Sequence, residues 1–256
     1  MWLWGYPARG CYEEIIDDMG VLVVEHEASA GPGYLAEWLA AAGTACRVVR
    51  PYTGDRLPAR ADDGLIVLGG TPSAWDDQVY PWLPATRELL RRSVADGVPT
   101  LGVCLGAQLL TLACGGTVER GTAGLEVGVH HVRPLPAAAD DPLFRHLRGP
   151  APAVQYHRDA MVRLPDGAVP LATGDRYPNQ AYRLGETAWA VQFHPEAGAE
   201  IFASWAAASS DKLTARGYDV EELTGQAKQA ETELVAAWRP LAEAFAKIVD
   251  RTRKTA

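Results

Sequence analysis

The first 115 residues alternate short apolar runs with segments of helical periodicity, and this alternation constrains the fold more than any other feature of the chain. Strands buried on both faces are expected at Val21–Glu25, Cys46–Val49, Leu65–Leu68 and Val98–Val103. Helices are expected at Tyr34–Ala42, Pro81–Ala95 and Leu105–Cys114. Strand–helix alternation is typical of a mostly parallel sheet covered by helices on both faces. The sequence therefore predicts an α/β fold whose functional groups lie at the carboxyl ends of the strands.

From Gly116 onward the pattern changes to short strands separated by turns. These strands are expected at Val118–Glu119, Glu126–Pro134, Ala153–Tyr156, Ala168–Thr173, Gln180–Leu184 and Ala188–Phe193. This half is more antiparallel, and it extends the first sheet or forms a small sheet beside it. The tail is helical, and an apolar stripe from Leu223 to Ile248 is suited to packing on the domain or on a second subunit of a homo-oligomer. Pro240 should kink or divide that helix.

Cys104 stands where the strand of Val98–Val103 meets the following helix, with Gly102 and Gly106 on either side. A sharp strand-to-helix turn needs small neighbours, because the backbone at the turn is strained. Such a turn places the thiol at a helix N-terminus, where the dipole and free N–H groups favour the thiolate. Cys104 is therefore a candidate nucleophile. The alternative is a small buried hydrophobic residue, as most free cysteines are, and this stretch alone does not separate the two.

A thiol nucleophile needs a base, and His194 is the best placed of the six histidines. It follows an apolar strand and precedes Pro195, which stops the strand. Glu196, two residues on, can hold the far ring nitrogen of His194. A solvated turn is the alternative for a His-x-Glu at a strand end. Gly69-Gly70, after another strand, lets a backbone approach a bound molecule closely.

These segments together resemble the class I glutamine amidotransferases. The resemblance is carried by Gly69-Gly70, Gly102–Gln108 and Gln192–Glu196, in that order on an α/β pattern. Within the family, the chain looks most similar to stand-alone proteins that resemble the glutaminase domain of GMP synthase. The resemblance implies a flavodoxin-like central sheet with additional antiparallel strands and C-terminal helices. It also implies a single domain over residues 20–250, preceded by an extension of unknown role at residues 1–19.

The family resemblance implies a catalytic triad. Cys104 would attack the side-chain carboxamide of glutamine, His194 would protonate the departing ammonia, and Glu196 would orient His194. The backbone N–H groups of Gly70 and Leu105 would form the oxyanion hole. Water would then hydrolyse a γ-glutamyl thioester on Cys104, and this half-reaction needs neither a metal nor an organic cofactor.

The resemblance also implies which residues bind the glutamyl part of the substrate. These are Gln108, Glu126, Gln155, Tyr156, His157 and Arg158. Two residues depart from the family pattern, since Thr71 follows the glycine pair where many members have proline, and Arg158 stands where the family has glycine. Either change could alter which γ-glutamyl amide the pocket accepts, although Arg158 could equally point to solvent.

The composition argues against several other classes of protein. A formal net charge of −8 disfavours a nucleic-acid or membrane-surface partner. No apolar run approaches the ~20 residues of a membrane span. The four cysteines are scattered without a C-x-x-C pair, so neither a zinc site nor a disulfide framework is indicated. A cytoplasmic location fits this cysteine usage best.

Three functions remain open from the sequence. The first is a glutamine amidotransferase or glutaminase that passes ammonia to a partner enzyme. The second is a hydrolase with the same chemistry on another γ-glutamyl amide, such as a γ-glutamyl amine or peptide, which Thr71 and Arg158 keep open. The third is a non-catalytic binding protein on the same fold, which the intact set of Cys104, His194 and Glu196 disfavours.

Overall fold

The computed structural model describes residues 20–255. The strands in this range form two sheets. The large sheet contains β1 (Val21–Val24), β2 (Cys46–Val49), β3 (Gly64–Val67), β4 (Thr100–Val103), β6 (Glu126–Pro134), β7 (Ala151–His157), β9 (Val169–Thr173), β10 (Ala181–Leu184) and β11 (Ala188–Val191). The small sheet pairs β5 (Thr117–Arg120) with β8 (Asp159–Arg163). The extension at residues 1–19 lies outside the described residues.

The large sheet has the order β2-β1-β3-β4-β11-β10-β9-β6-β7. Strands β2, β1, β3, β4 and β11 are parallel, whereas β10, β9, β6 and β7 continue it with antiparallel pairs. The predicted α/β fold, with a central sheet and an antiparallel extension, is confirmed. The connectivity matters for function because β11, late in the sequence, lies in the middle of the sheet beside β4. Residues that follow β4 and β11 therefore meet at one edge.

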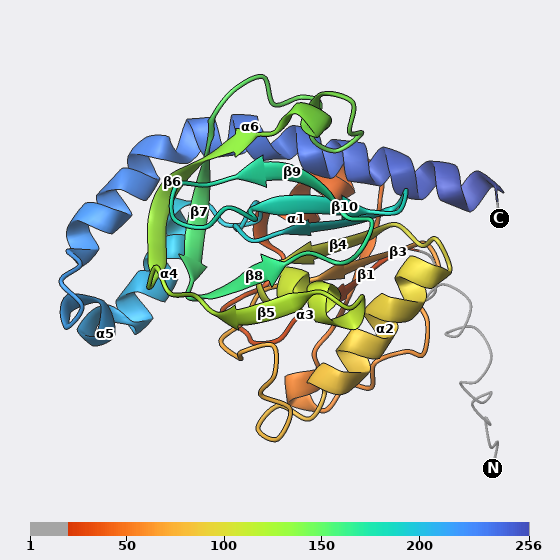
Figure 1. The fold of residues 1–256 in the computed structure, drawn as a ribbon, viewed down its shortest axis with the longest axis horizontal. Helices are drawn as coiled ribbons and strands as arrows, with labels where there is room; N and C mark the ends of the chain where they lie inside the picture. Colours follow the sequence, from red (N-terminus) through yellow and green to blue (C-terminus); the bar gives the residue numbers. More distant parts are fainter. Residues whose placement is uncertain (1–19, 256) are drawn as a thin grey trace, which may run out of the picture.

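Helices cover both faces of the sheet (Figure 1). They are α1 (Gly33–Ala41), α2 (Leu83–Ala95), α3 (Leu105–Ala113), α4 (Ala199–Ala208), α5 (Ser210–Thr214) and α6 (Val220–Thr255), with short 3-10 turns at Pro51–Thr53 and Pro136–Ala139. Alternate residues of β1 enter different cores, since Val21 and Val23 pack with α1, α4 and α6, and Leu22 and Val24 pack with α2 and α3. This two-sided burial is why the first strands are continuously apolar.

The C-terminal helix α6 continues without a break through Pro240, so the expected division of this helix is wrong. Proline removes one backbone hydrogen bond and costs about 3 kcal/mol in a helix interior. Burial of the apolar stripe opposes that cost, because Leu234, Trp238, Leu241 and Phe245 are all buried against this same chain. Of the two partners expected for the stripe, the domain itself is therefore the one that covers it.

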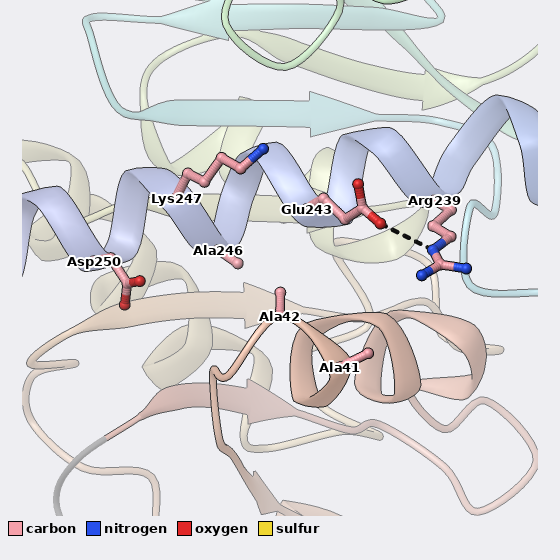
Figure 2. A pocket seen from close by; sticks show the side chains of 7 residues that line it. All are labelled: Ala41, Ala42, Arg239, Glu243, Ala246, Lys247 and Asp250. Carbon is pink, nitrogen blue, oxygen red and sulfur yellow. Dashed lines mark hydrogen bonds and ion pairs between the residues drawn. The ribbon is translucent and has the colours of Figure 1, made fainter.

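Small residues bring α6 close to the end of α1. Figure 2 shows Ala41 and Ala42 beneath Ala246, with the Arg239–Glu243 ion pair further along the same helix. A shallow groove of about 250 Å³ remains between the two elements. Its charged side chains are mixed in sign, so the groove presents no single charge to a ligand.

Strand β8, which pairs with β5 outside the large sheet, was not predicted from the sequence. The segment Asp159–Arg163 has only three buried residues followed by two exposed ones, which is too short to give a periodic signal. Strand β8 matters for the site, because the corner between β7 and β8 places His157, Arg158 and Asp159 beside the first turn of α3.

Candidate active site

Cys104 occupies a strained elbow between β4 and α3. Its φ of 50° and ψ of −105° make it the one non-glycine residue with positive φ among residues 20–255. The elbow depends on Gly106, because a Cβ there would lie 1.9 Å from the Val67 carbonyl oxygen. Gly102 is equally constrained, since a Cβ on it would lie 2.7 Å from the backbone of Gly106. The two glycines around Cys104 thus let α3 start directly against the sheet.

His194 and Glu196 form a buried pair beyond β11. The backbone of His194 bridges to Val154, and its N–H donates to the Val154 carbonyl at 2.9 Å. Nδ1 of His194 lies 2.7 Å from Oε1 of Glu196, and the two residues are only 4% and 1% exposed. Burial opposes the charged ring, but the Glu196 carboxylate and the Cys104 sulfur outweigh it and raise the pKa of His194. Nε2 has no hydrogen-bond partner among the described residues.

Cys104 and His194 meet because β4 and β11 are paired in parallel, with Val103 opposite Val191. Gly69 shows how close they are. A Cβ on Gly69 would lie 2.8 Å from Cε1 of His194 and 3.4 Å from Cβ of Cys104. Three strand ends, those of β3, β4 and β11, therefore bring Gly69, Cys104 and His194 to one point.

The two residues expected to form an oxyanion hole also lie together. A Cβ on Gly70 would be 3.5 Å from Cδ2 of Leu105. Leu105 is the first residue of α3, so its N–H has no acceptor within the helix. Thr71, the residue after Gly70, is exposed, and its N–H donates to Oε2 of Glu27 at 3.3 Å. Thr71, which stands where many members of the family have proline, is thus held by a hydrogen bond from its backbone to Glu27.

His26 supports the glycine loop from behind and was not singled out from the sequence. A Cβ on Gly70 would lie 2.9 Å from Cβ of His26. Nδ1 of His26 accepts a hydrogen bond from Nε1 of Trp82 at 3.0 Å, and burial lowers the pKa of His26 to about 4. This histidine is consequently neutral at pH 7 and adds no positive charge to the site.

The side chain of Gln192 contacts the sulfur of Cys104 and is itself held by Gln108. Nε2 of Gln192 donates to Sγ of Cys104 at 3.8 Å. Gln108 fixes that amide, because its own Nε2 donates to the Asp159 carbonyl at 3.0 Å and to Oε1 of Gln192 at 3.3 Å. The sequence placed Gln192 within the motif of His194 and Glu196 but assigned it no role of its own. The available signal was its position two residues before His194, since alternate residues of an extended segment share a face.

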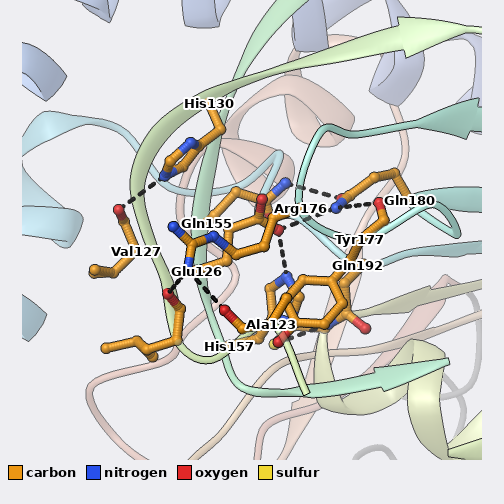
Figure 3. A network of polar contacts seen from close by, with 12 residues as sticks. Ala123, Glu126, Val127, His130, Gln155, His157, Arg176, Tyr177, Gln180 and Gln192 are labelled. Carbon is orange, nitrogen blue, oxygen red and sulfur yellow. Dashed lines mark hydrogen bonds and ion pairs between the residues drawn. The ribbon is translucent and has the colours of Figure 1, made fainter. Parts of the chain in front are cut away.

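Several residues expected to bind substrate form an internal polar network (Figure 3). Oε2 of Glu126 lies 3.0 Å from Nε2 of His157 and 3.1 Å from Nε2 of Gln180. Gln155 joins through its Nε2, which donates to Oε1 of Gln180 at 2.9 Å. Nδ1 of His157 lies 2.9 Å from the Asp159 carbonyl. The network therefore fixes the corner between β7 and β8.

A cavity of about 440 Å³ opens above Cys104 and His194. Trp205 forms one wall, with its ring edge-on to His194 at 4.8 Å between centroids. The predicted binding residues that reach the cavity are Gln108, Tyr156, His157 and Arg158. Glu126 and Gln155 do not line it and lie behind His157 in the network. Four of the predicted binding residues thus form part of the cavity wall, whereas Glu126 and Gln155 lie behind it.

Comparison with known proteins identifies the family. A model described as glutamine amidotransferase class-I matches residues 33–204, a range that includes Cys104, His194 and Glu196. The chain belongs to the class I glutamine amidotransferases. A glutamine amidotransferase-like protein of Salmonella typhimurium is 30% identical over 183 residues, which cover 70% of this chain and 76% of that protein.

The family includes larger enzymes and solved stand-alone structures. GMP synthase of Synechococcus sp. is 34% identical over 147 residues, which are 56% of this chain and 26% of that enzyme, so the match spans about a quarter of the relative. A glutamine amidotransferase from Thermotoga maritima superposes with a TM-score of 0.79 at 27% identity, covering 90% of this chain and 99% of that one. One from Methylobacillus flagellatus gives 0.78 at 28% identity, covering 91% and 94%.

Within residues 20–255, no group of three or more His, Cys, Asp or Glu side chains is arranged to hold a metal ion. In the same range, no helix combines the length and the apolar character needed to cross a membrane.

Proposed function

We propose that this class I glutamine amidotransferase hydrolyses the side-chain amide of glutamine through a γ-glutamyl thioester on Cys104. One observation carries the proposal: a strained cysteine at a helix N-terminus lies beside a buried histidine that a carboxylate holds at 2.7 Å. A purely structural cysteine needs neither the strain nor the partner, and strain of this kind costs of order 1–3 kcal/mol. The arrangement therefore argues against a non-catalytic binding protein.

The acylation step follows from these positions. Glu196 holds Nδ1 of His194, so Nε2 is the nitrogen left to take the thiol proton from Cys104. The thiolate attacks the amide carbon, and the N–H groups of Gly70 and Leu105 stabilise the oxyanion. His194 then returns its proton to the nitrogen, the C–N bond breaks, and ammonia leaves.

Deacylation reverses these roles. Water enters where ammonia left, His194 takes its proton, and the hydroxyl attacks the thioester carbon. The C–S bond breaks, Cys104 regains its proton and glutamate is released. Every proton in this proposed cycle moves between water, substrate and side chains of this chain, so the cycle calls for no metal or organic cofactor.

We further propose that the ammonia serves a partner enzyme. The GMP synthases that this chain resembles are glutamine-hydrolysing enzymes of about four times the matched length. This chain matches about a quarter of such an enzyme, and we propose that a partner enzyme is the acceptor of its ammonia. Glutamine and a reduced thiol point to the cytoplasm as the place of reaction. Assembly into a homo-oligomer stays a prediction.

The proposal is tested by measuring glutamate and ammonia released from glutamine by the purified chain. Cys104→Ser should abolish release, and mass spectrometry of acid-quenched protein should find a glutamyl adduct on the Cys104 peptide. Cys46→Ser is the matched control, because burial raises the pKa of Cys46 to about 11 and keeps it a poor nucleophile. Full activity in Cys104→Ser would refute the proposed mechanism.

A second candidate function is hydrolysis of a different γ-glutamyl amide by the same chemistry. The favouring observation is the cavity, which at about 440 Å³ is of the size that holds ligands larger than one amino acid. Only the leaving group would differ, since the γ-glutamyl half and the thioester are common to both reactions.

A further inference from the structure

The rim of the active-site cavity carries an excess of positive charge. Four cationic side chains line the cavity, namely Arg120, Arg158, Lys212 and Arg216. Arg120 is neutralised, because its Nε lies 2.9 Å from Oδ1 of Asp159. Within residues 20–255, the other three make no ion pair with a carboxylate. This local excess contrasts with the net charge of −8 of the whole chain.

The three unpaired cations come from two separate parts of the fold. Arg158 stands at the corner between β7 and β8, whereas Lys212 lies on α5 and Arg216 follows it. The segment after α5 is held in place, since the hydroxyl of Tyr218 donates to the Leu125 carbonyl at 2.9 Å. Leu125 itself lines the cavity. Two elements distant in sequence are therefore fastened together so that their charges face one opening.

The γ-glutamyl group cannot neutralise this rim by itself. It carries one free carboxylate and one ammonium group, so its net charge is zero. Glu27 is the acid on the cavity lining that has no cationic partner, and it suits the ammonium group. One cation suits the carboxylate, which leaves two of the three cations uncompensated. A cleft with an excess of one sign concentrates ligands of the opposite sign.

We infer that the site prefers γ-glutamyl amides whose amine part is itself an anion, in particular γ-glutamyl amino acids. This inference rests on the proposed function, because it uses the same thioester on Cys104. The γ-carbonyl must lie at Cys104, so the leaving group is the part that extends away from it. A carboxylate on that leaving group would reach the rim formed by Arg158, Lys212 and Arg216.

The step balances without any new reactant. The sulfur of Cys104 forms a bond to the γ-carbonyl carbon while the C–N bond to the amino acid breaks. The nitrogen takes the proton that His194 received from the thiol, so an amino acid leaves in place of ammonia. Water then hydrolyses the thioester as proposed for glutamine, and glutamate is the second product.

The test compares two substrates that differ by one charge, γ-glutamylglycine and γ-glutamylglycinamide, with glutamine alongside. We expect kcat/KM for γ-glutamylglycine to be higher by roughly fivefold, since Arg158, Lys212 and Arg216 are exposed and two charges a few Å apart in water interact by about that factor. Salt of about 0.5 M should reduce the ratio, because it screens exposed charges. A Lys212→Met/Arg216→Met double variant should bring the ratio close to one.

Lys228→Met is the matched control, because Lys228 is an exposed lysine of α6 that does not line the cavity. This variant should keep the full preference. Equal kcat/KM for the two dipeptide substrates, hydrolysis of glutamine alone, or a preference that survives the double variant would each overturn the inference and leave the proposed function standing. Absence of Cys104-dependent hydrolysis of all three substrates would instead refute the proposed function, and this inference with it.

Discussion

Replacing Gly69 by alanine tests the geometry of the site with a single added methyl group. That methyl carbon would lie 2.8 Å from Cε1 of His194, whereas ordinary van der Waals contact begins near 3.4 Å. The imidazole ring must therefore move by about 0.6 Å or more, away from the position that faces Cys104. A misplacement of ~1 Å costs about 100-fold in rate. We expect kcat/KM for glutamine to fall roughly 10- to 100-fold.

The assay needs a control that separates geometry from folding. Gly69 does not have a positive φ, so its backbone conformation suits alanine. Overpacking by the added methyl group should lower the free energy of unfolding by about 1–3 kcal/mol. Gly149→Ala makes the same chemical change where no atom lies within 4 Å. Glutamate release and thermal unfolding should be measured for both variants. Near-normal activity in a folded Gly69→Ala protein would refute the positions assigned to His194 and Cys104.

Three further substitutions have defined outcomes. Glu196→Gln should lower the pKa of His194, because it removes the carboxylate that favours the charged ring. The alkaline limb of the kcat/KM–pH profile should then move to lower pH, and kcat should fall roughly 10²- to 10⁴-fold. An alkaline limb at the same pH as in the unaltered protein would contradict this. Gln192→Leu should slow alkylation of Cys104 by iodoacetamide several-fold, because the sulfur loses its N–H donor, and an unchanged rate would show that this contact is passive. Gly225→Ala, in α6 with no atom within 4 Å of an added Cβ, should raise the free energy of unfolding by about 0.5–1 kcal/mol in urea titration, and a loss of stability would contradict the open space beside this helical residue.

The parallel half of the fold could be predicted from the sequence because its signal is local. Strands buried on both faces have to be apolar throughout, and Gly102 and Gly106 mark the tight turn around Cys104. The continuity of α6 through Pro240 was not predictable in this way, because the packing that opposes the cost of proline comes from distant elements. Hydrophobic periodicity carries no information on such long-range contacts.

The residues of the candidate site likewise divide into those that the sequence predicted and those whose contacts depend on tertiary packing. Motifs placed Cys104 and His194 at strand ends, but they did not show that β11 lies beside β4. The contact between Gln192 and Cys104 was not predicted, because the motif that contains Gln192 does not show which side chain its amide meets. Glu126 and Gln155 were expected at the substrate, yet their hydrogen bonds lie inside the protein. The partners of a buried polar group are decided by tertiary packing.

The placement of β11 also has a consequence for how the protein acquires its activity. The strand that leads to His194 inserts between β4 and β10, although most of the sheet precedes it in the sequence. Contacts between segments so far apart form slowly, because a long loop must close first. A chain that has folded only up to α3 already has the Cys104 thiol but no base beside it. In the mechanism proposed above, ammonia release therefore requires the last strand of the sheet, and its appearance during refolding would mark the completion of folding.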